Sequence, residues 1–156
     1  MRHGEALPVG GSIPDDSARP LSPAGKAQVQ KVAEGLRRQA PVLEAIICSP
    51  LKRATETGQI LAQVLGVSSL EISKYLAPST STTGIHPLLK KYAQSKSILM
   101  VGHHPDVTEL TALLTGLDPS ACPLFGTASI VALAFEPKQK KATFLWYQTS
   151  EQLSQR

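Results

Sequence analysis

The sequence predicts a three-layer α/β/α domain in which helices cover both faces of a mostly parallel central sheet. Three observations lead to this fold class. Short apolar runs of strand length alternate with segments of helical periodicity, polar clusters follow two of these runs, and only a turn separates the last two runs. Such a turn predicts an antiparallel edge pair near the C-terminus. With 156 residues and no internal repeat, the chain is expected to form a single domain over residues 1–156.

The first half of the chain is expected to contain a loop, two helices and a buried strand. Residues 8–20 are rich in Gly, Pro, Ser and Asp, which is typical of a loop. Ser22-Pro23 then fits a helix N-cap followed by proline at the first helical position, and apolar residues recur at helical spacing over 23–40. The short apolar run at 43–48 predicts a buried strand, and a helix is expected over 51–65.

The second half continues the alternation of strands and helices. The expected elements are a short strand at 70–72, a polar loop at 78–84, a helix at 86–93, a strand at 97–101, a helix at 105–115, and strands at 127–135 and 142–147. The last two strands are the antiparallel edge pair, because a short polar turn joins them.

Composition excludes several classes of protein. Hydrophobic residues make up 42% of the chain and charged residues 18%, which is ordinary for a globular protein and unlike a disordered one. No apolar run approaches the roughly 18 residues of a membrane span, and the N-terminus lacks the apolar region of a signal peptide. The two cysteines, Cys48 and Cys122, are far apart, and such sparse usage favours a reducing compartment. We therefore expect a cytoplasmic protein with no membrane partner.

The net charge of +4 raises the alternative of a nucleic-acid binder. Much of the excess comes from Lys90-Lys91, Lys96 and the lysines within 138–141. No aromatic residues alternate with these lysines to stack on bases, and the pair Trp146-Tyr147 lies in a predicted strand. Short solvated lysine clusters are the simpler interpretation, so no nucleic-acid partner is expected.

Three short polar segments carry the residue types of a phosphate site. Arg2-His3-Gly4 stands at the N-terminus, the segment from Ser49 to Arg53 follows the strand at 43–48, and Gly102-His103 follows the strand at 97–101. Ligands bind beyond the carboxyl ends of parallel strands, so the last two segments are expected at one site. Arginine binds phosphate oxygens with a planar, permanently charged fork, and neutral imidazole is a competent nucleophile.

Together, Arg2-His3-Gly4, Ser49-Pro-Leu-Lys-Arg53-Ala-Thr-Glu-Thr57 and Gly102-His103 resemble the motifs of the histidine phosphatase superfamily, which has the phosphoglycerate mutase-like fold. The resemblance covers nearly the whole chain, and the three motifs have the order and spacing of that family. The short length, the segment Arg19-Pro-Leu and the strand motif Phe144-Leu-Trp are most similar to its SixA-type branch, the phosphohistidine phosphatases.

The resemblance implies a role for each site residue. His3 would attack phosphorus and form a covalent phosphohistidine, which water then hydrolyses. Arg2 and Arg53 would clamp the equatorial oxygens of the phosphoryl group, where charge develops during transfer. His103 would donate a hydrogen bond to the phosphate. Gly4 would let the main chain turn close to the ligand.

Two further roles concern phosphate and the orientation of the nucleophile. By the same resemblance, Arg19 would be a fourth phosphate contact, and a backbone carbonyl would fix the other ring nitrogen of His3.

A metal site formed by His86, His103 and His104 is an alternative. Adjacent residues rarely point at one ion, and no Cys or carboxylate completes a ligand pattern. No metal and no cofactor are therefore expected.

The loop before the second histidine motif lacks an acid. Many family members carry a glutamate there that protonates a leaving alkoxide, whereas residues 76–84 contain no carboxylate and the nearest is Glu71. An alkoxide is about as basic as hydroxide, whose conjugate acid has a pKa of about 15.7. Protonated phosphoimidazole leaves as neutral imidazole, whose conjugate acid has a pKa of about 6.5. Three other carboxylates could approach from the first loop: Glu5, Asp15 and Asp16.

These observations favour a phosphohistidine phosphatase that acts on a phosphorylated protein, with phosphorelay-type proteins as the implied partners and a monomer as the default state. Two alternatives remain open. One is a broad phosphomonoesterase of the same superfamily, and the other is an inactive phosphate-binding or scaffold member.

The position of Arg2-His3-Gly4 carries a further expectation. In the family this motif follows the first, central strand, and only Met1 precedes it here. A strand needs roughly five residues, so the first strand is expected to be truncated, with about four to seven apolar residues before Met1. If Met1 were instead the natural start, the neighbouring strands would keep buried backbone groups without partners.

Overall fold

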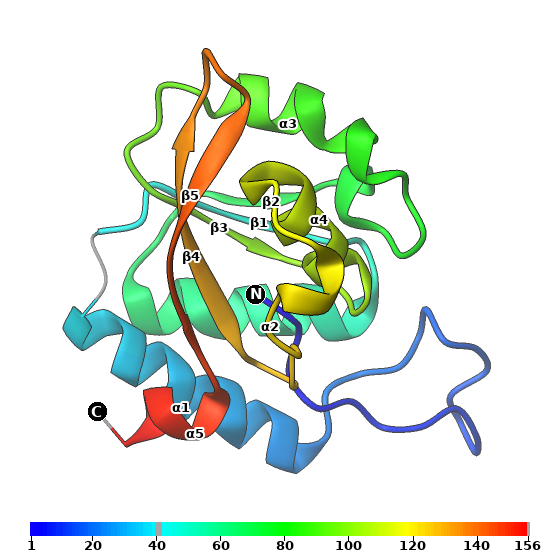
Figure 1. The fold of residues 1–156 in the computed structure, drawn as a ribbon. Coiled ribbons are helices and arrows are strands. Elements are labelled where there is room, and N and C mark those ends of the chain that lie inside the picture. The colour runs from blue at the N-terminus through cyan, green and yellow to red at the C-terminus, as the bar shows by residue number, and fades with distance from the viewer. Residues whose placement is uncertain (40–41, 156) are drawn as a thin grey trace.

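The computed structural model describes residues 1–39 and 42–155, and the chain forms three layers (Figure 1). The helices are α1 (Pro23–Gln39), α2 (Lys52–Leu65), α3 (His86–Lys91), α4 (Asp106–Thr115) and α5 (Ser150–Ser154). The strands are β1 (Ala45–Cys48), β2 (Leu70–Ile72), β3 (Ile98–Val101), β4 (Ile130–Glu136) and β5 (Lys141–Gln148). In Figure 1, α1, α2 and α5 lie on one side of the strands, and α3 and α4 lie on the other.

β1 is the central strand of a parallel sheet with the order β2-β1-β3. All four of its residues are buried, as expected for a strand that is covered on both faces. Because successive side chains point to opposite faces, Ile46 and Cys48 join the core with α1, α2 and α5. Ala45 and Ile47 join the second core with α3 and α4. The predicted three-layer α/β architecture is therefore confirmed.

The ends of two helices follow from the local sequence. Ser22 caps α1, because its hydroxyl accepts a hydrogen bond from the Gly25 N–H at 2.9 Å. α2 ends at Gly66, which has a φ of 69° and donates its N–H to the carbonyl of Ala62. α2 begins only four residues after β1, so Arg53 in its first turn lies near the carboxyl end of the central strand.

The antiparallel pair β4–β5 is a second sheet that is connected to the first through the N-terminal residues. Arg2 forms a parallel bridge with Gly102, and the His3 N–H donates to the Gly102 carbonyl at 3.1 Å. On the other side, the Arg2 N–H donates to Ser129 and the Ala128 N–H donates to the His3 carbonyl. These bonds place His3 at the carboxyl end of the parallel sheet.

The structure corrects some predicted boundaries. The helix predicted over 86–93 ends at Lys91, because Tyr92 leaves the helical conformation and donates its hydroxyl to Glu71. The strand predicted over 127–135 begins at Ile130, since a turn closed by the Ser129 N–H and the Gly126 carbonyl precedes it. Residue 40 of the helix predicted over 23–40 lies outside the described residues.

Short elements account for the remaining differences from the sequence prediction. α5 follows β5 and is stabilised by a capping box between Thr149 and Gln152. The sequence analysis did not predict this helix. The predicted polar loop at 78–84 contains most of a 3-10 turn at Thr82–Ile85. Within the described part of the chain, no helix combines the length and the apolar character that crossing a membrane requires.

Candidate active site

The three polar segments meet at the carboxyl end of the parallel sheet, as predicted. His3 follows the N-terminal bridge, His103 follows β3, and Arg53 lies in the first turn of α2. All three side chains are buried, and the rings of His3 and His103 have their centroids 5.1 Å apart. Thr57 of α2 ties two segments together, because its hydroxyl accepts a hydrogen bond from the Gly4 N–H at 3.1 Å.

The hydrogen bonds of His3 define its tautomer. Arg53 donates from Nε to Nε2 of His3 at 3.1 Å. Since a guanidinium can only donate, Nε2 carries the lone pair of the ring. Nδ1 lies 2.6 Å from the Gly4 carbonyl, so it is the protonated nitrogen and donates to that oxygen. Nε2 is therefore the atom of His3 that can act as a nucleophile.

The surroundings of His3 keep its ring neutral. Burial lowers the pKa of His3 to about 4, against the opposing effect of the Gly4 carbonyl. The positive charges of Arg53, Arg2 and, more weakly, Arg19 lower the pKa further. At pH near 7 the imidazole thus keeps the lone pair that a nucleophile needs.

His103 is held by a buried hydroxyl. Its Nε2 lies 2.6 Å from Oγ of Ser49, which is fully buried, and its Nδ1 has no hydrogen-bond partner among the described residues. Burial lowers the pKa of His103 to about 3, and the neighbouring His3 and Arg53 act in the same direction. An anion bound beside His103 would favour the charged ring and so raise this pKa.

Asp16 connects two arginines of the site. Arg53 donates from Nη1 to the Asp16 backbone carbonyl at 2.6 Å and from Nη2 to its carboxylate at 2.9 Å. Arg19 donates from Nη1 to the other carboxylate oxygen at 2.9 Å. The hydrogen bonds from Arg19 and then Arg53 lower the pKa of Asp16, so its carboxylate is charged near neutral pH. A phosphate that binds these guanidinium groups must compete with this carboxylate.

Arg2 is the second arginine of the candidate site. Its Nη1 donates to the Phe125 carbonyl at 2.7 Å, while its buried Nε has no partner among the described residues. Burial and the charge of Arg53 lower the pKa of Arg2, and an anion bound between the two groups would oppose both effects because it favours the charged guanidinium.

Gly4 has a packing reason for its position in addition to the expected closeness to a ligand, which stays a prediction. Its φ lies outside the left-handed region, so a sharp turn does not require glycine here. A Cβ at Gly4 would instead lie 2.5 Å from Cγ2 of Val29 in α1. The missing side chain lets the nucleophile segment pack directly against this helix.

The carboxylates considered as possible acids are engaged elsewhere. Asp15 accepts hydrogen bonds from the backbone of residues 17 and 18, and Glu5 accepts from the hydroxyl of Ser22 at 2.7 Å. Asp16 contacts Arg53, which donates to His3, but Asp16 is there as a charged partner of two arginines. The acid-free loop does contact one carboxylate that the sequence reasoning missed, because the Ser79 N–H donates to Asp106 at 3.2 Å.

The sequence analysis also missed two contacts between side chains of the site. The sequence motif contains Ser49, but only the fold places its hydroxyl on His103, and only the fold brings Asp16 to Arg53. No local pattern indicates either pairing. His104 is exposed and His86 half-exposed. Within residues 1–39 and 42–155, no group of three or more metal-ligating side chains comes together.

Comparisons with known proteins agree with this geometry. Residues 1–77 match the model of the histidine phosphatase superfamily (branch 1). The chain is 30% identical over 153 residues to the phosphohistidine phosphatase SixA of Escherichia coli K12. The aligned region covers 94% of this chain and 89% of that protein. The solved structure of the protein histidine phosphatase SixA complexed with tungstate aligns with a TM-score of 0.87 and 29% identity, covering 98% and 96% of the two chains.

A more distant similarity extends the fold comparison. A mycobacterial glucosyl-3-phosphoglycerate phosphatase in complex with inorganic phosphate aligns with a TM-score of 0.73 at 18% identity, covering 96% of each chain. The α/β fold and the paired histidines and arginines define a phosphatase. The chain belongs to the histidine phosphatase superfamily.

Proposed function

We propose that the protein is a phosphohistidine phosphatase, which removes phosphate from a phosphorylated protein through a covalent intermediate on His3. The arrangement of His3 carries this proposal. Its Nδ1 donates to the Gly4 carbonyl, its Nε2 lone pair faces Arg53, and its pKa of about 4 keeps the ring neutral. The name of the SixA relative supports the same substrate class.

The proposed reaction has two in-line steps. The Nε2 lone pair of His3 forms a bond to phosphorus as the nitrogen–phosphorus bond of the substrate breaks. Arg2, Arg53 and Arg19 balance the charge of the phosphoryl oxygens, and His103 donates to one of them. Water then attacks phosphorus as the bond between phosphorus and Nε2 breaks, phosphate leaves as dihydrogen phosphate with both hydrogens of that water, and His3 regains its lone pair.

The leaving group matches the lack of an acid in the loop at 78–84. A phosphohistidine substrate that is protonated on its second ring nitrogen departs as neutral imidazole, so no enzyme group has to supply a proton. A phosphomonoester would instead need a donor for its alkoxide. Asp16, the carboxylate that contacts Arg53, has a pKa lowered by its two arginine partners and is a poor proton donor.

Replacing His3 by alanine is expected to abolish the acid-labile phosphoenzyme and to lower turnover by at least about 10⁴-fold, as loss of a nucleophile does. The measurement is rapid quenching of enzyme mixed with a radiolabelled phosphohistidine protein. His104→Ala is the matched control, because this histidine is exposed and directly follows His103 in the sequence. His3→Asn, with a melting curve, separates loss of chemistry from loss of fold. Label retained in both His3 variants would remove His3 as the nucleophile.

Phosphohistidine proteins are expected to be hydrolysed at least about 10²-fold faster, in kcat/KM, than phosphomonoesters, since only the esters need a general acid. Phosphate release from a phosphohistidine protein and from a panel of sugar and aryl phosphates tests this. Faster turnover of the esters would favour the broad phosphomonoesterase. No turnover and no phosphoenzyme with any substrate would favour the inactive phosphate-binding member.

A phosphorelay-type partner, a monomeric state and a cytoplasmic location remain predictions of the sequence. The partner is part of the proposal, because the Asp16 side chain that Arg53 contacts is 59% exposed, so a phosphorylated side chain of another protein can approach from this side. Gel filtration with light scattering measures the oligomeric state directly.

A further inference from the structure

A buried hydroxyl lies against the second histidine of the candidate active site. Ser49, which directly follows β1, is fully buried, and its Oγ lies 2.6 Å from Nε2 of His103. The same oxygen accepts a hydrogen bond from the Leu51 N–H at 3.3 Å. The mechanism above gives Ser49 no part in binding or transferring phosphate. Its hydroxyl can therefore act on the reaction only through the ring that it contacts.

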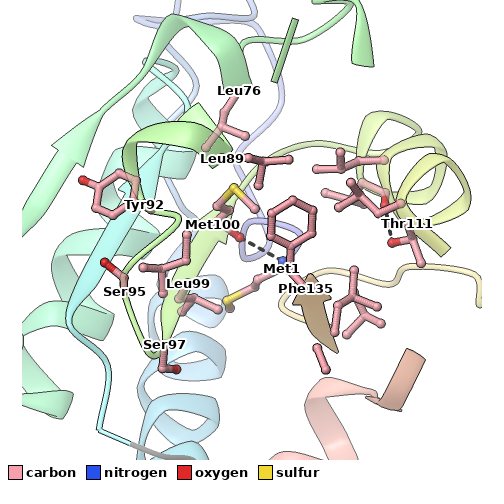
Figure 2. Close-up of a pocket in the computed structure, with 18 of the residues that line it drawn as sticks. Met1, Leu76, Leu89, Tyr92, Ser95, Ser97, Leu99, Met100, Thr111 and Phe135 are labelled. Atoms are coloured by element: carbon pink, nitrogen blue, oxygen red, sulfur yellow. Dashed lines mark hydrogen bonds between the residues drawn. The ribbon is translucent and has the colours of Figure 1, made fainter. Parts of the chain in front are cut away.

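The backbone holds this hydroxyl and this ring in place from both sides of β3. On one side, the Ser49 N–H donates to the Val101 carbonyl at 3.0 Å, which continues the parallel pairing of β1 with β3. On the other side, the amino group of Met1 donates to the Met100 carbonyl (Figure 2), and the Gly102 N–H donates to the Met1 carbonyl. The strand that leads to the second histidine is thus bonded on both edges, and the hydroxyl meets the ring at a fixed position.

The number of donors and acceptors defines where the hydrogens lie. A hydroxyl has one hydrogen to donate, and its oxygen can accept at the same time. Since the Leu51 N–H already points at Oγ of Ser49, the hydroxyl hydrogen is available for Nε2 of His103. If Nε2 instead donated to Ser49, the hydroxyl hydrogen would be buried with no acceptor among the described residues, which is costly. Ser49 is therefore the donor, and Nε2 carries the lone pair.

This arrangement leaves the one hydrogen of the neutral ring on Nδ1. The ring is neutral in the free protein because burial lowers the pKa of His103 to about 3. In residues 1–39 and 42–155, two buried side-chain nitrogen or oxygen atoms have no partner: Nδ1 of His103 and Nε of Arg2. Both belong to the candidate site, and both are donors in this state, so an anion would satisfy each of them. The opposite tautomer of His103 would present a lone pair to the anion and repel it.

We propose that Ser49 is a positioning residue, which holds the neutral ring of His103 in the tautomer with its hydrogen on Nδ1 and so provides a donor for the phosphoryl oxygens. This role rests on the proposed function, because the donor matters only where a phosphoryl group is transferred. His3 has the same tautomer through different partners, the Gly4 carbonyl and Nε of Arg53. One histidine thus offers a bare Nε2 to phosphorus, and the other offers the hydrogen of Nδ1 to the oxygens.

NMR of the protein labelled with 15N in its histidines tests the tautomer without any substrate. The protonated and the bare nitrogen of a neutral imidazole resonate far apart, so long-range 1H–15N spectra near neutral pH show which nitrogen carries the hydrogen. The signals of His103 are identified by their absence in His103→Gln. In the unmodified protein, we expect the hydrogen on Nδ1. In Ser49→Ala, the share of the other tautomer should rise about tenfold, because one hydrogen bond that favours the first tautomer is lost.

The rate should follow the tautomer. Ser49→Ala is expected to lower kcat/KM for a phosphohistidine protein by about tenfold, since the reactive tautomer is less populated. Ser49→Cys keeps a weaker donor at the same place and should give an intermediate ratio and rate. Melting curves show whether each variant is folded.

Ser73→Ala is the matched control for the loss of a buried hydroxyl. Ser73 follows β2 as Ser49 follows β1, its N–H donates to the Cys48 carbonyl, and its Oγ accepts from the Tyr75 N–H. It has no hydrogen bond to a histidine among the described residues. Its replacement should leave the tautomer of His103 and kcat/KM unchanged.

A hydrogen on Nε2 of His103 in the unmodified protein, or an unchanged tautomer in Ser49→Ala, would overturn the proposal. An equal shift in Ser73→Ala would also overturn it, because loosened packing would then be the cause. A shifted tautomer with unchanged kcat/KM would contradict the role in the reaction. The tautomer is read in the free protein, so it is decided even if no substrate is turned over, an outcome that would instead contradict the proposed function.

Discussion

Arg53→Ala is expected to lower kcat/KM for a phosphohistidine substrate by about a thousandfold. The guanidinium is buried, donates to Nε2 of His3 and reaches Asp16 with both terminal nitrogens. In the proposed mechanism, its removal takes away both a charge that stabilises the transferring phosphoryl group and the hydrogen-bond donor that orients His3. Loss of one preorganised donor at such a site costs about 10²–10³ in rate, and a charged fork contributes at the upper end.

Two variants make this expectation specific. Lys52→Ala removes a cation one position away, on an exposed side chain at the start of α2, and should leave kcat/KM within about threefold because exposed charges contribute little. Arg53→Lys keeps the charge but not the planar fork, and should recover only part of the loss.

The pH profile provides a second readout for Arg53. The positive charge of Arg53 helps to lower the pKa of His3, so its removal should move the acidic limb of the kcat/KM profile to higher pH. A purely structural role would reduce stability without this movement. An Arg53→Ala enzyme within tenfold of wild type, with an unchanged profile, would contradict the assigned role.

The residues of the site were predictable because they lie in contiguous motifs with fixed chemistry. Arg53 lies in the first turn of the helix after β1 and His103 follows β3, and a parallel sheet gathers such positions at one edge, whereas Arg2 and His3 were placed at the site by the family resemblance. Their hydrogen-bond partners were not predictable in the same way. Asp16 reaches Arg53 from a loop whose path depends on long-range contacts, including the Lys52 N–H bond to the carbonyl of residue 17.

The prediction of the fold succeeded where the local sequence has a clear pattern. It failed where an element depends on contacts between residues that are distant in sequence. β1 and β3 are recognisable because every residue in them is apolar. The start of α1 is recognisable because Ser22 and Pro23 are typical of a helix N-terminus. α5 has only five residues and depends on packing against α1, where the Leu153 carbonyl lies against Gly35. The junction between the two sheets depends on the backbone bonds of Arg2 and His3 to Gly102, Ala128 and Ser129, which no local pattern predicts.

The stability of the chain is expected to rise with pH between about 5 and 8. The buried amino group of Met1 has a pKa lowered from 8.0 to about 5, chiefly by burial. In this interval the unfolded chain binds a proton there and the folded chain does not, so the free energy of unfolding rises with pH. At about 1.4 kcal/mol for each pH unit, this group alone costs about 4 kcal/mol at pH 5 relative to pH 8.

Other buried groups make stability depend on pH below 6.5 and above 9. His3 and His103 have pKa values lowered to about 4 and about 3, so their contribution to stability is lost as the pH falls below 6.5. Cys48 has its pKa raised from 9.0 to about 12 by burial, so stability falls again above pH 9, where only the unfolded chain releases the proton. Among the groups with a shifted pKa, the Met1 amine alone titrates between pH 6.5 and 8.

Urea unfolding at pH 6.5 and pH 8 isolates the amine. The free energy of unfolding should increase by about 2 kcal/mol over this interval in the unmodified chain. Acetylation of Met1 removes the proton-binding group and should flatten the interval, while the decrease below pH 6.5 remains because His3 and His103 still titrate. An equal rise in the acetylated chain would show that a different group is responsible. A flat interval in both chains would mean that the amine is solvated in the folded chain.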